Sequence, residues 1–332
     1  MAASPASIKK LFQQFNDMRV MIIGDVMLDK YIFGQVDRIS PEAPVPIVDV
    51  RSATARPGGA ANVAVNVHAL GATPFLFSVT GKDHDADMLC ELLEDQHIDP
   101  QYMLHADERV TTSKMRVVSK QNQMLRIDHE MQDALIDETA AVFKTSVLQF
   151  IRKKKPHVVI IEDYDKGVLS ADLITAVIAA CKHLHIPVTV DPKKKNFFQY
   201  TGCSLFKPNL RELRDSLDGN PTTPLLADMK RATQALQTLM HHHTTMVTLG
   251  EHGVFIQEGK KAKVIPAHHR DIADVSGAGD TVISVASLCM AAGADMFTTA
   301  ALSNLAGGLV CEHAGVVPVD KQQLLREAIK AI

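Results

Sequence analysis

Short apolar runs alternate with longer segments in which apolar residues recur every three or four positions. The short runs include RVMIIGD (19–25), PHVVIIED (156–163) and IPVTVDP (186–192), and each predicts a buried strand. Segments 137–154 and 226–240 have helical spacing. Buried strands that alternate with helices form a parallel sheet with helices on both faces. We therefore expect an α/β protein, a three-layer αβα arrangement around a mostly parallel central sheet.

Two segments, at about 31–50 and 110–128, do not follow this rhythm. Both have half-polar, period-two stretches, and the second has the pattern of a hairpin with Lys120-Gln121-Asn122 as its turn. No repeat or linker divides the remaining sequence. We expect one domain over residues 1–332, with these segments inserted as a small β-sheet lid that covers a site or pairs with a second subunit.

Composition excludes several classes of protein. Hydrophobic residues make up 46% and charged residues 22%, and the net charge of −3 does not suggest nucleic acid or a membrane surface as a partner. The five cysteines have no CxxC spacing, which favours buried free thiols in a reducing compartment. The N-terminal segment MAASPASIKKLFQQF has no apolar core and looks like the start of an amphipathic helix. We expect a cytoplasmic protein.

Polar residues follow several predicted strands. They are Asp25, Glu162 with Asp163, Asp191, Asn209 and Gly250. An isolated acid after a strand is more often a helix cap or turn residue than a catalytic group. Ligands of parallel sheets, however, collect at the carboxyl ends of the strands. So many polar positions at one edge favour a site there.

The stretch DVSGAGDT (274–281) comes directly before a long apolar helix. If that helix begins at Gly277, the backbone N–H groups of Gly277, Ala278, Gly279 and Asp280 lie in its unpaired first turn and form an anion site. Asp280 could simply match the helix dipole. A carboxylate beside an anion site would also repel a stored phosphate, and it suits the deprotonation of an attacking hydroxyl. We interpret the stretch as a phosphoryl-transfer site.

Other phosphate and metal motifs give little support to alternatives. No GxxxxGK[ST] occurs, and no GxGxxG follows the first strand, which argues against a P-loop protein and a dinucleotide-dependent oxidoreductase. The run HHH (241–243) has no spaced partner ligands, so a solvated helix end is favoured over a metal site.

Five motifs together resemble those of the ribokinase-like carbohydrate kinases. In chain order they are GGAAN (58–62), DP (191–192), KPNLRE (207–212), TLGEHG (248–253) and DVSGAGDT (274–281). One of them alone would be weak, but their order and spacing match over nearly the whole chain. The resemblance implies the ribokinase-like fold and an ATP-dependent sugar kinase.

Further stretches resemble one branch of that family, the D-glycero-β-D-manno-heptose-7-phosphate kinases. These are GDVMLDKY, RISPEAPVPIV, PGGAANVAVNV, EDYDKGVL and DPK. The branch phosphorylates O1 to give the 1,7-bisphosphate, on the way to ADP-heptose for the lipopolysaccharide core. The kinase motifs run out shortly before Ile332, so a separate adenylyltransferase is expected. A kinase for another phosphorylated sugar, such as a hexose phosphate, and a non-catalytic sugar or nucleotide sensor remain alternatives.

The resemblance also implies roles for individual residues. Asp280 would be the general base, and Gly277, Ala278 and Gly279 the anion hole. Asn209 and Glu212 would position Mg²⁺ and the phosphates, with Glu212 acting through water. The nucleotide side would also include Thr248, Gly250 and Gly253. The substrate side would comprise Asp25, Gly58, Gly59, Asn62, Arg116, Lys166, Asp191 and Lys193, and the further candidates for holding the substrate's own phosphate are Lys114 and Arg126.

ATP and Mg²⁺ are the expected donor and cofactor. A K⁺ ion beside residues 277–280, here called the anion turn, is left open, and a homodimer through the lid is expected. The roles of Lys194 and Lys195 are also left open.

Overall fold

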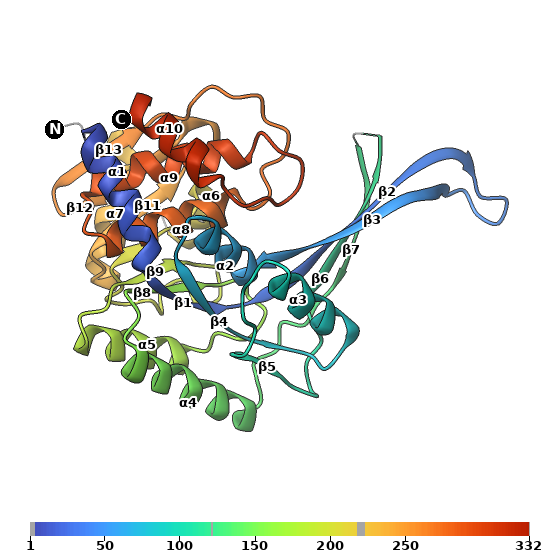
Figure 1. The fold of residues 1–332 in the computed structure, drawn as a ribbon, viewed down its shortest axis with the longest axis horizontal. Helices are drawn as coiled ribbons and strands as arrows, with labels where there is room; N and C mark the ends of the chain where they lie inside the picture. Colours follow the sequence, from blue (N-terminus) through green and yellow to red (C-terminus); the bar gives the residue numbers. More distant parts are fainter. Residues whose placement is uncertain (1–3, 121, 218–222, 332) are drawn as a thin grey trace.

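A nine-stranded sheet lies between two helical layers in the computed structural model, and a four-stranded sheet projects from it (Figure 1). The structure describes residues 4–120, 122–217 and 223–331. The strand order of the large sheet is β13-β12-β11-β10-β9-β8-β1-β4-β5. Its strands are β1 (Arg19–Gly24), β4 (Thr73–Thr80), β5 (Met103–His105), β8 (Val158–Glu162), β9 (Val188–Asp191), β10 (Leu205–Phe206), β11 (Thr244–Thr248), β12 (Val254–Glu258) and β13 (Lys261–Ile265).

The neighbouring strands β11, β10, β9, β8, β1, β4 and β5 are parallel, whereas β12 and β13 add an antiparallel edge. The described helices are α1 (Pro5–Gln14), α2 (Ala60–Ala69), α3 (His84–Glu94), α4 (Asp137–Lys154), α5 (Ala171–His183), α6 (Leu210–Ser216), α7 (Leu226–Met240), α8 (Ala278–Ala291), α9 (Met296–Val310) and α10 (Lys321–Ala331), and short 3₁₀ turns lie at Phe15–Asp17 and Gly250–His252. The predicted three-layer α/β fold is confirmed.

Each face of the large sheet packs against its own helical layer. Alternate residues of β1 separate into two cores: Val20 and Ile22 face one layer, while Met21 and Ile23 face the other. The first core includes apolar residues of α1, α2, α3, α8, α9 and α10, and the second includes those of α4, α5, α6 and α7. Within the described part of the chain, no helix is long and apolar enough to cross a bilayer.

The smaller sheet has the strand order β3-β2-β6-β7 and contains the two segments expected to form a lid, so it is here called the lid. Its role in covering a site stays a prediction. Its strands are β2 (Val26–Ile39), β3 (Pro46–Gly59), β6 (Ser113–Ser119) and β7 (Asn122–His129). Strands β2 and β3 extend beyond the expected segment 31–50, whereas β6 and β7 lie almost entirely within 110–128. β2 starts two residues after β1 ends, and β3 runs directly into α2, so this pair of lid strands is joined to the rest of the fold without a long loop (Figure 1). The predicted turn residue Gln121 lies outside the described residues.

The two faces of the lid differ in chemistry, because paired residues share a face and successive residues alternate. One face, here called the charged lid face, presents Arg56, Asp29, Tyr31, Lys114, Arg116, Arg126 and Asp128. The other, here called the apolar lid face, presents Ile32, Met115, Val117, Leu125 and Ile127.

Candidate active site

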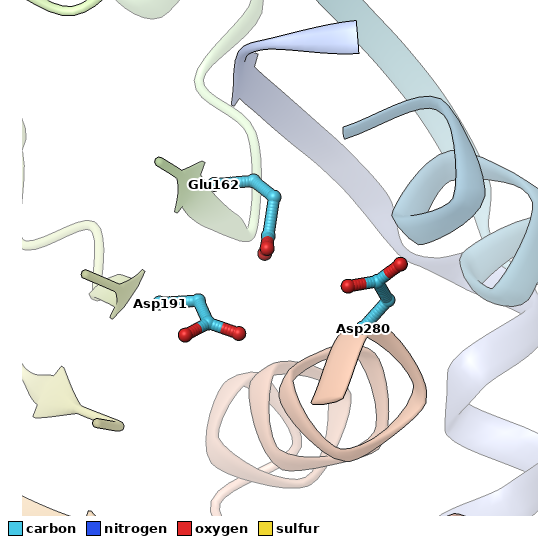
Figure 2. Close-up of side chains that lie close together, drawn as sticks. All are labelled: Glu162, Asp191 and Asp280. Carbon is cyan, nitrogen blue, oxygen red and sulfur yellow. The ribbon is translucent and has the colours of Figure 1, made fainter. Parts of the chain in front are cut away.

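Three carboxylates meet where the carboxyl ends of two strands approach the first turn of α8. Glu162 ends β8, Asp191 ends β9 and Asp280 lies near the start of α8. One oxygen of each side chain lies within 4.8 Å of the others, and all three residues are buried (Figure 2). This is the only group of at least three potential metal-ligating side chains found among the described residues.

Glu162 is the unusual member of this group. It is completely buried, and neither of its carboxylate oxygens has a hydrogen-bond partner in the structure. Burial, reinforced by the charges of Asp191 and Asp280, raises its pKa well above the usual value. A buried carboxylate without partners is costly unless something binds it, and carboxylate oxygens are the ligands that Mg²⁺ prefers. Glu162 and Asp191 therefore fit a divalent cation.

Asp280 is held from both sides. Asn62 Nδ2 donates to its Oδ2 at 2.6 Å, and the Tyr164 hydroxyl donates to its Oδ1 at 2.7 Å. Burial raises the pKa of Asp280 to about 6; the charge of Asp191 acts in the same direction, while the hydrogen bonds from Asn62 and Tyr164 oppose it. Such a carboxylate is ionised near neutral pH and still basic enough to accept a proton. The sequence did not reveal Tyr164, which lies 116 residues away.

The turn before Asp280 differs from the sequence-based expectation in two details, because the helix begins one residue later and the Ala278 amide is paired. Helix α8 begins at Ala278, with Gly277 as its N-cap at φ +78°. A side chain at Gly277 would not fit, because its Cβ would lie 2.9 Å from Asn62 Nδ2. The Ala278 amide already makes a long hydrogen bond of 3.3 Å to the Val275 carbonyl. The amides of Gly279 and Asp280 belong to the first helical turn, whose N–H groups have no acceptor within the helix.

Lys207 brings a positive charge to the same turn. Its ammonium group lies 2.8 Å from Asp191 Oδ2, and both residues are buried. A Cβ built on Gly279 would lie 3.7 Å from Lys207 Nζ, so the lysine is close to the backbone of the anion turn. The KPNLRE motif contains this residue, but its spacing alone did not indicate that the lysine reaches the turn.

Asn209 and Glu212 form a capping box at the start of α6. The Asn209 side chain accepts from the Glu212 amide, and Glu212 Oε2 accepts from the Asn209 amide, both at 2.8 Å. Glu212 Oε1 is paired with Lys193 at 2.6 Å. The bridge between Asn209 and Thr248 brings the TLGEHG turn, with Gly250 and Gly253, beside this cap. The predicted magnesium and nucleotide roles of these residues stay predictions.

The Asp25 carboxylate accepts hydrogen bonds from the loop that follows β8. Its Oδ2 accepts from the amides of Tyr164 and Lys166 at 2.9 and 3.1 Å, and its Oδ1 accepts from the Val168 amide at 3.1 Å. Burial, with the charge of Asp163, raises its pKa to about 6. These bonds fix Tyr164 beside Asp280. The predicted contact of Asp25 with a sugar hydroxyl stays a prediction.

Asp29 is an acid that sequence reasoning missed, although it lies in the quoted GDVMLDKY stretch. It is almost fully buried and paired with Arg116 at 2.5 Å. A Cβ on Gly58 would lie 2.2 Å from Asp29 Oδ2, so the glycine makes room for this carboxylate. Gly59 has φ +59° and caps α2. Asp29 is thus the residue of the charged lid face that lies against Gly58, one of the glycines expected on the substrate side.

Lys114 and Lys166 share one carboxylate. Glu130 Oε2 lies 2.9 Å from Lys114 Nζ, and its Oε1 lies 3.0 Å from Lys166 Nζ. Burial opposes ionisation of Glu130, but the two lysines outweigh it and lower the pKa of the carboxyl to about 2. Arg126 pairs with Asp128 at 2.9 Å. The structure therefore brings Lys114, Lys166, Arg116 and Arg126 to one side of the lid, while Lys193 lies beside Glu212.

The HHH run differs from the expected solvated helix end. His241 and His243 are exposed, but His242 is buried against the Phe206 ring, with 5.5 Å between ring centroids. His242 Nε2 is 2.6 Å from Thr245 Oγ1. The Phe206 ring and this hydroxyl contact the imidazole, whose Nδ1 is buried without a hydrogen-bond partner. The run therefore includes one histidine of the core.

Comparisons with known proteins give one family match over most of the chain. The model of the family described as pfkB family carbohydrate kinase matches residues 17–322. Among curated relatives, the "Bifunctional protein HldE" of Pseudomonas aeruginosa (strain LESB58) is 39% identical over 320 residues, covering 96% of this chain and 65% of the relative. The protein of the same name from Pseudomonas putida (strain GB-1) is 40% identical, covering 96% and 65%. The chain thus spans about two thirds of the length of these relatives.

Solved structures show the same fold. Phosphofructokinase-2 from Escherichia coli in complex with potassium has a TM-score of 0.76 at 19% identity, with coverage of 94% of this chain and 99% of that chain. Ribokinase from Arabidopsis thaliana, complexed with ribose and ATP, has a TM-score of 0.75 at 16% identity, with coverage of 95% and 100%.

Proposed function

This chain belongs to the pfkB family of carbohydrate kinases, and we propose that it transfers a phosphoryl group from ATP to O1 of D-glycero-β-D-manno-heptose 7-phosphate. The observation that carries the proposal is the position of Asp280, which is buried beside residues 277–279. Asp280 lies near Asp191, and Asp191 is paired with Lys207. A base, backbone N–H donors and a cation at one point are the parts that phosphoryl transfer requires.

Asp280 would take the proton of the sugar's O1 hydroxyl as that oxygen attacks the phosphoryl group. Asn62 and Tyr164 each donate to one oxygen of Asp280, so they fix the direction in which the carboxylate faces. The amides of the first turn of α8 would receive the equatorial phosphoryl oxygens. Lys207 would stabilise the charge that spreads over these oxygens during transfer.

The kinase reaction implies Mg²⁺, which neutralises charge on the ATP phosphates when bound. The unpartnered oxygens of Glu162, together with Asp191, fit its oxygen-ligand chemistry. Glu212, expected to act through water, is engaged by its own helix cap and by Lys193. We therefore propose a direct role for Glu162, together with Asp191, whose Oδ2 is paired with Lys207, and retain Glu212 on the nucleotide side.

The charged lid face supports a substrate that carries its own phosphate. Arg116 and Arg126 are paired across β6 and β7, and Lys114 lies on the same face of β6. Guanidinium groups bind phosphate oxygens through two parallel hydrogen bonds. The heptose assignment itself rests on the RISPEAPVP segment and on the relatives named HldE.

We place the reaction in the cytoplasm, where ATP is available, and in ADP-heptose biosynthesis for the lipopolysaccharide core. An adenylyltransferase would consume the 1,7-bisphosphate. We also propose that the chain forms a homodimer through the apolar lid face, because Leu125 and Ile127 expose 55% and 49% of their surface there.

A phosphoryl-transfer assay with Mg-ATP tests the proposal. Heptose 7-phosphate, a hexose 6-phosphate and unphosphorylated heptose are compared, and ³¹P NMR identifies the phosphorylated oxygen. We expect the highest kcat/KM with heptose 7-phosphate and phosphorylation at O1. Assays with and without KCl settle the potassium requirement. Preference for the hexose phosphate would favour the other sugar kinase, and binding without transfer would favour a sensor.

Two arginine variants test how the substrate phosphate is recognised. Arg116→Ala should raise KM for the phosphorylated sugar about tenfold or more, because a charge-assisted pair is lost. Its KM for unphosphorylated heptose should change little. Arg51→Ala, at an exposed arginine of β3, is the matched control. An equal effect of Arg116→Ala on both substrates would contradict recognition of the phosphate by the lid.

A further inference from the structure

We propose that Arg56 is a positioning residue for phosphoryl transfer, whose guanidinium ties lid strand β3 to the loop that supports the anion turn of α8. The proposal rests on the proposed kinase function but adds a device to it. Through Arg56, strand β3 on the substrate side and the turn that would receive the phosphoryl group are expected to move together.

Arg56 reaches from the lid into a loop 258 residues further along the chain. Its Nη1 donates to the Val316 carbonyl at 2.7 Å and to the Ala314 carbonyl at 3.2 Å. Its guanidinium also lies over the Tyr31 ring, 5.6 Å from the centroid. One nitrogen thus fixes two carbonyls of the same loop.

Gly315 allows this close approach. It has φ +71°, and a Cβ built there would lie 2.9 Å from Arg56 Nη1 and 3.4 Å from the Tyr31 ring. A larger residue would push the loop away from both side chains. Loop, arginine and ring are therefore fitted to each other, whereas a surface arginine would keep many orientations.

The same loop holds the anion turn by two contacts. The Gly315 amide donates to Asp274 Oδ2 at 3.0 Å, and Asp274 Oδ1 accepts from the amide and hydroxyl of Ser276 at 3.0 and 2.8 Å. The side chain of Val316 also packs against Gly277, since a Cβ there would lie 3.2 Å from Val316 Cγ1. Displacement of residues 314–316 would therefore displace Ser276 and Gly277.

Arg56 is equally close to the substrate side. It lies two residues before Gly58 on β3 and pairs in register with Asp29 on β2. Ordering of this strand by a bound sugar would order the arginine, the loop and the turn together. A turn displaced by about 1 Å can cost about 10²-fold in rate, so the effect should appear in kcat.

The test compares Arg56→Ala, Arg56→Lys and the control Arg51→Ala. We expect Arg56→Ala to lower kcat about 10- to 100-fold, with less than about threefold change in KM for the sugar. Arg56→Lys should keep part of the activity because it can still donate to a carbonyl. Millimolar methylguanidinium should restore part of the kcat of Arg56→Ala only, because it fills the vacated position.

Hydrogen exchange measured by mass spectrometry provides a readout that does not depend on activity. Segments 274–280 and 311–317 should exchange faster in Arg56→Ala than in the native chain, while α4 should be unchanged. Unchanged exchange in these segments, or a native kcat in Arg56→Ala, would overturn the proposal. Faster exchange in a chain that transfers no phosphate to any sugar would keep the coupling and reject the kinase function.

Discussion

The chemistry expected of Asp280 depends on residues far from it in the sequence. Asn62 and Tyr164 each occupy one of its oxygens, and Asp25 fixes the loop that carries Tyr164. Burial keeps the carboxylate basic, while the two donors keep it ionised near neutral pH. A single acid near a helix N-terminus becomes a candidate base because of this setting.

Replacing Asp280 by Asn removes the base and keeps the shape of the side chain. We expect kcat to fall about 10²- to 10⁴-fold, with a small change in the KM for ATP. Steady-state kinetics measure both values. Asp271→Asn, at an exposed acid before the same turn, is the control. Near-native turnover of Asp280→Asn would rule out this carboxylate as the base.

Glu162→Gln should separate stability from cation binding. Without Mg²⁺ the variant should be at least as stable as the native chain, because a buried acid without hydrogen-bond partners, whose ionisation burial opposes, is replaced by an amide that carries no charge. At saturating Mg²⁺ the native chain should gain roughly 1–3 kcal/mol of stability, and the variant much less. Thermal denaturation with and without MgCl₂ measures this difference, with Glu91→Gln as the exposed control. Equal stabilisation of both chains would argue against a cation at Glu162.

At the scale of helices and strands, the local pattern predicted most bounds. The sequence placed helices at 137–154 and 226–240, and α4 and α7 have these bounds. The apolar spacing of both helices is regular, and each helix is followed by a strand. The residues near each helix are therefore enough to predict where it begins and ends. Strand β1 was predicted for the same reason.

The extent of the lid strands could not be predicted in the same way. The first residues of β2 are buried like those of a core strand, and only later residues alternate. The point at which β2 leaves the core and enters the lid depends on its pairing and twist against β3 and β6. The spacing of apolar residues within one segment does not predict that point. The contributions of Tyr164, Lys207 and Arg56 were hidden too, because each depends on a partner that the fold brings near.

The segment after α7 gives a pH-dependent prediction. Burial lowers the pKa of His242 from 6.5 to about 4. The folded chain therefore resists protonation that the unfolded chain accepts, so stability is full above about pH 6.5 and falls as the pH decreases towards 4. Denaturant unfolding between pH 7 and 4 should show a smaller loss for His242→Gln than for the native chain.

His269→Gln, at an exposed histidine, should keep the native pH dependence of unfolding. If His242→Gln and the native chain lost stability in parallel, another group would be responsible for the acid sensitivity.

For the whole molecule, the projecting lid offers a surface for a second copy (Figure 1). Leu125 and Ile127 lie on the apolar lid face, and both are about half exposed. Light scattering after size exclusion should give twice the mass of one chain for the native protein and one chain mass for Leu125→Glu/Ile127→Glu. Val142→Glu, at an exposed apolar residue of α4, should remain a dimer. A native monomer, or a dimer in the double variant, would reject this interface.

The alternation of charged and apolar side chains along the lid also limits how its length can change during evolution. Inserting one residue into β6 just before Lys114 would move Lys114 and Arg116 to the apolar lid face and Met115 to the charged lid face, reversing both surfaces in a single step. Bulges between Phe33 and Gly34 and between Val117 and Val118 mark where the pairing already shifts. Homologues should therefore differ in length beyond these bulges, at the tips of the hairpins, and keep a constant number of residues between the bulges and the main sheet.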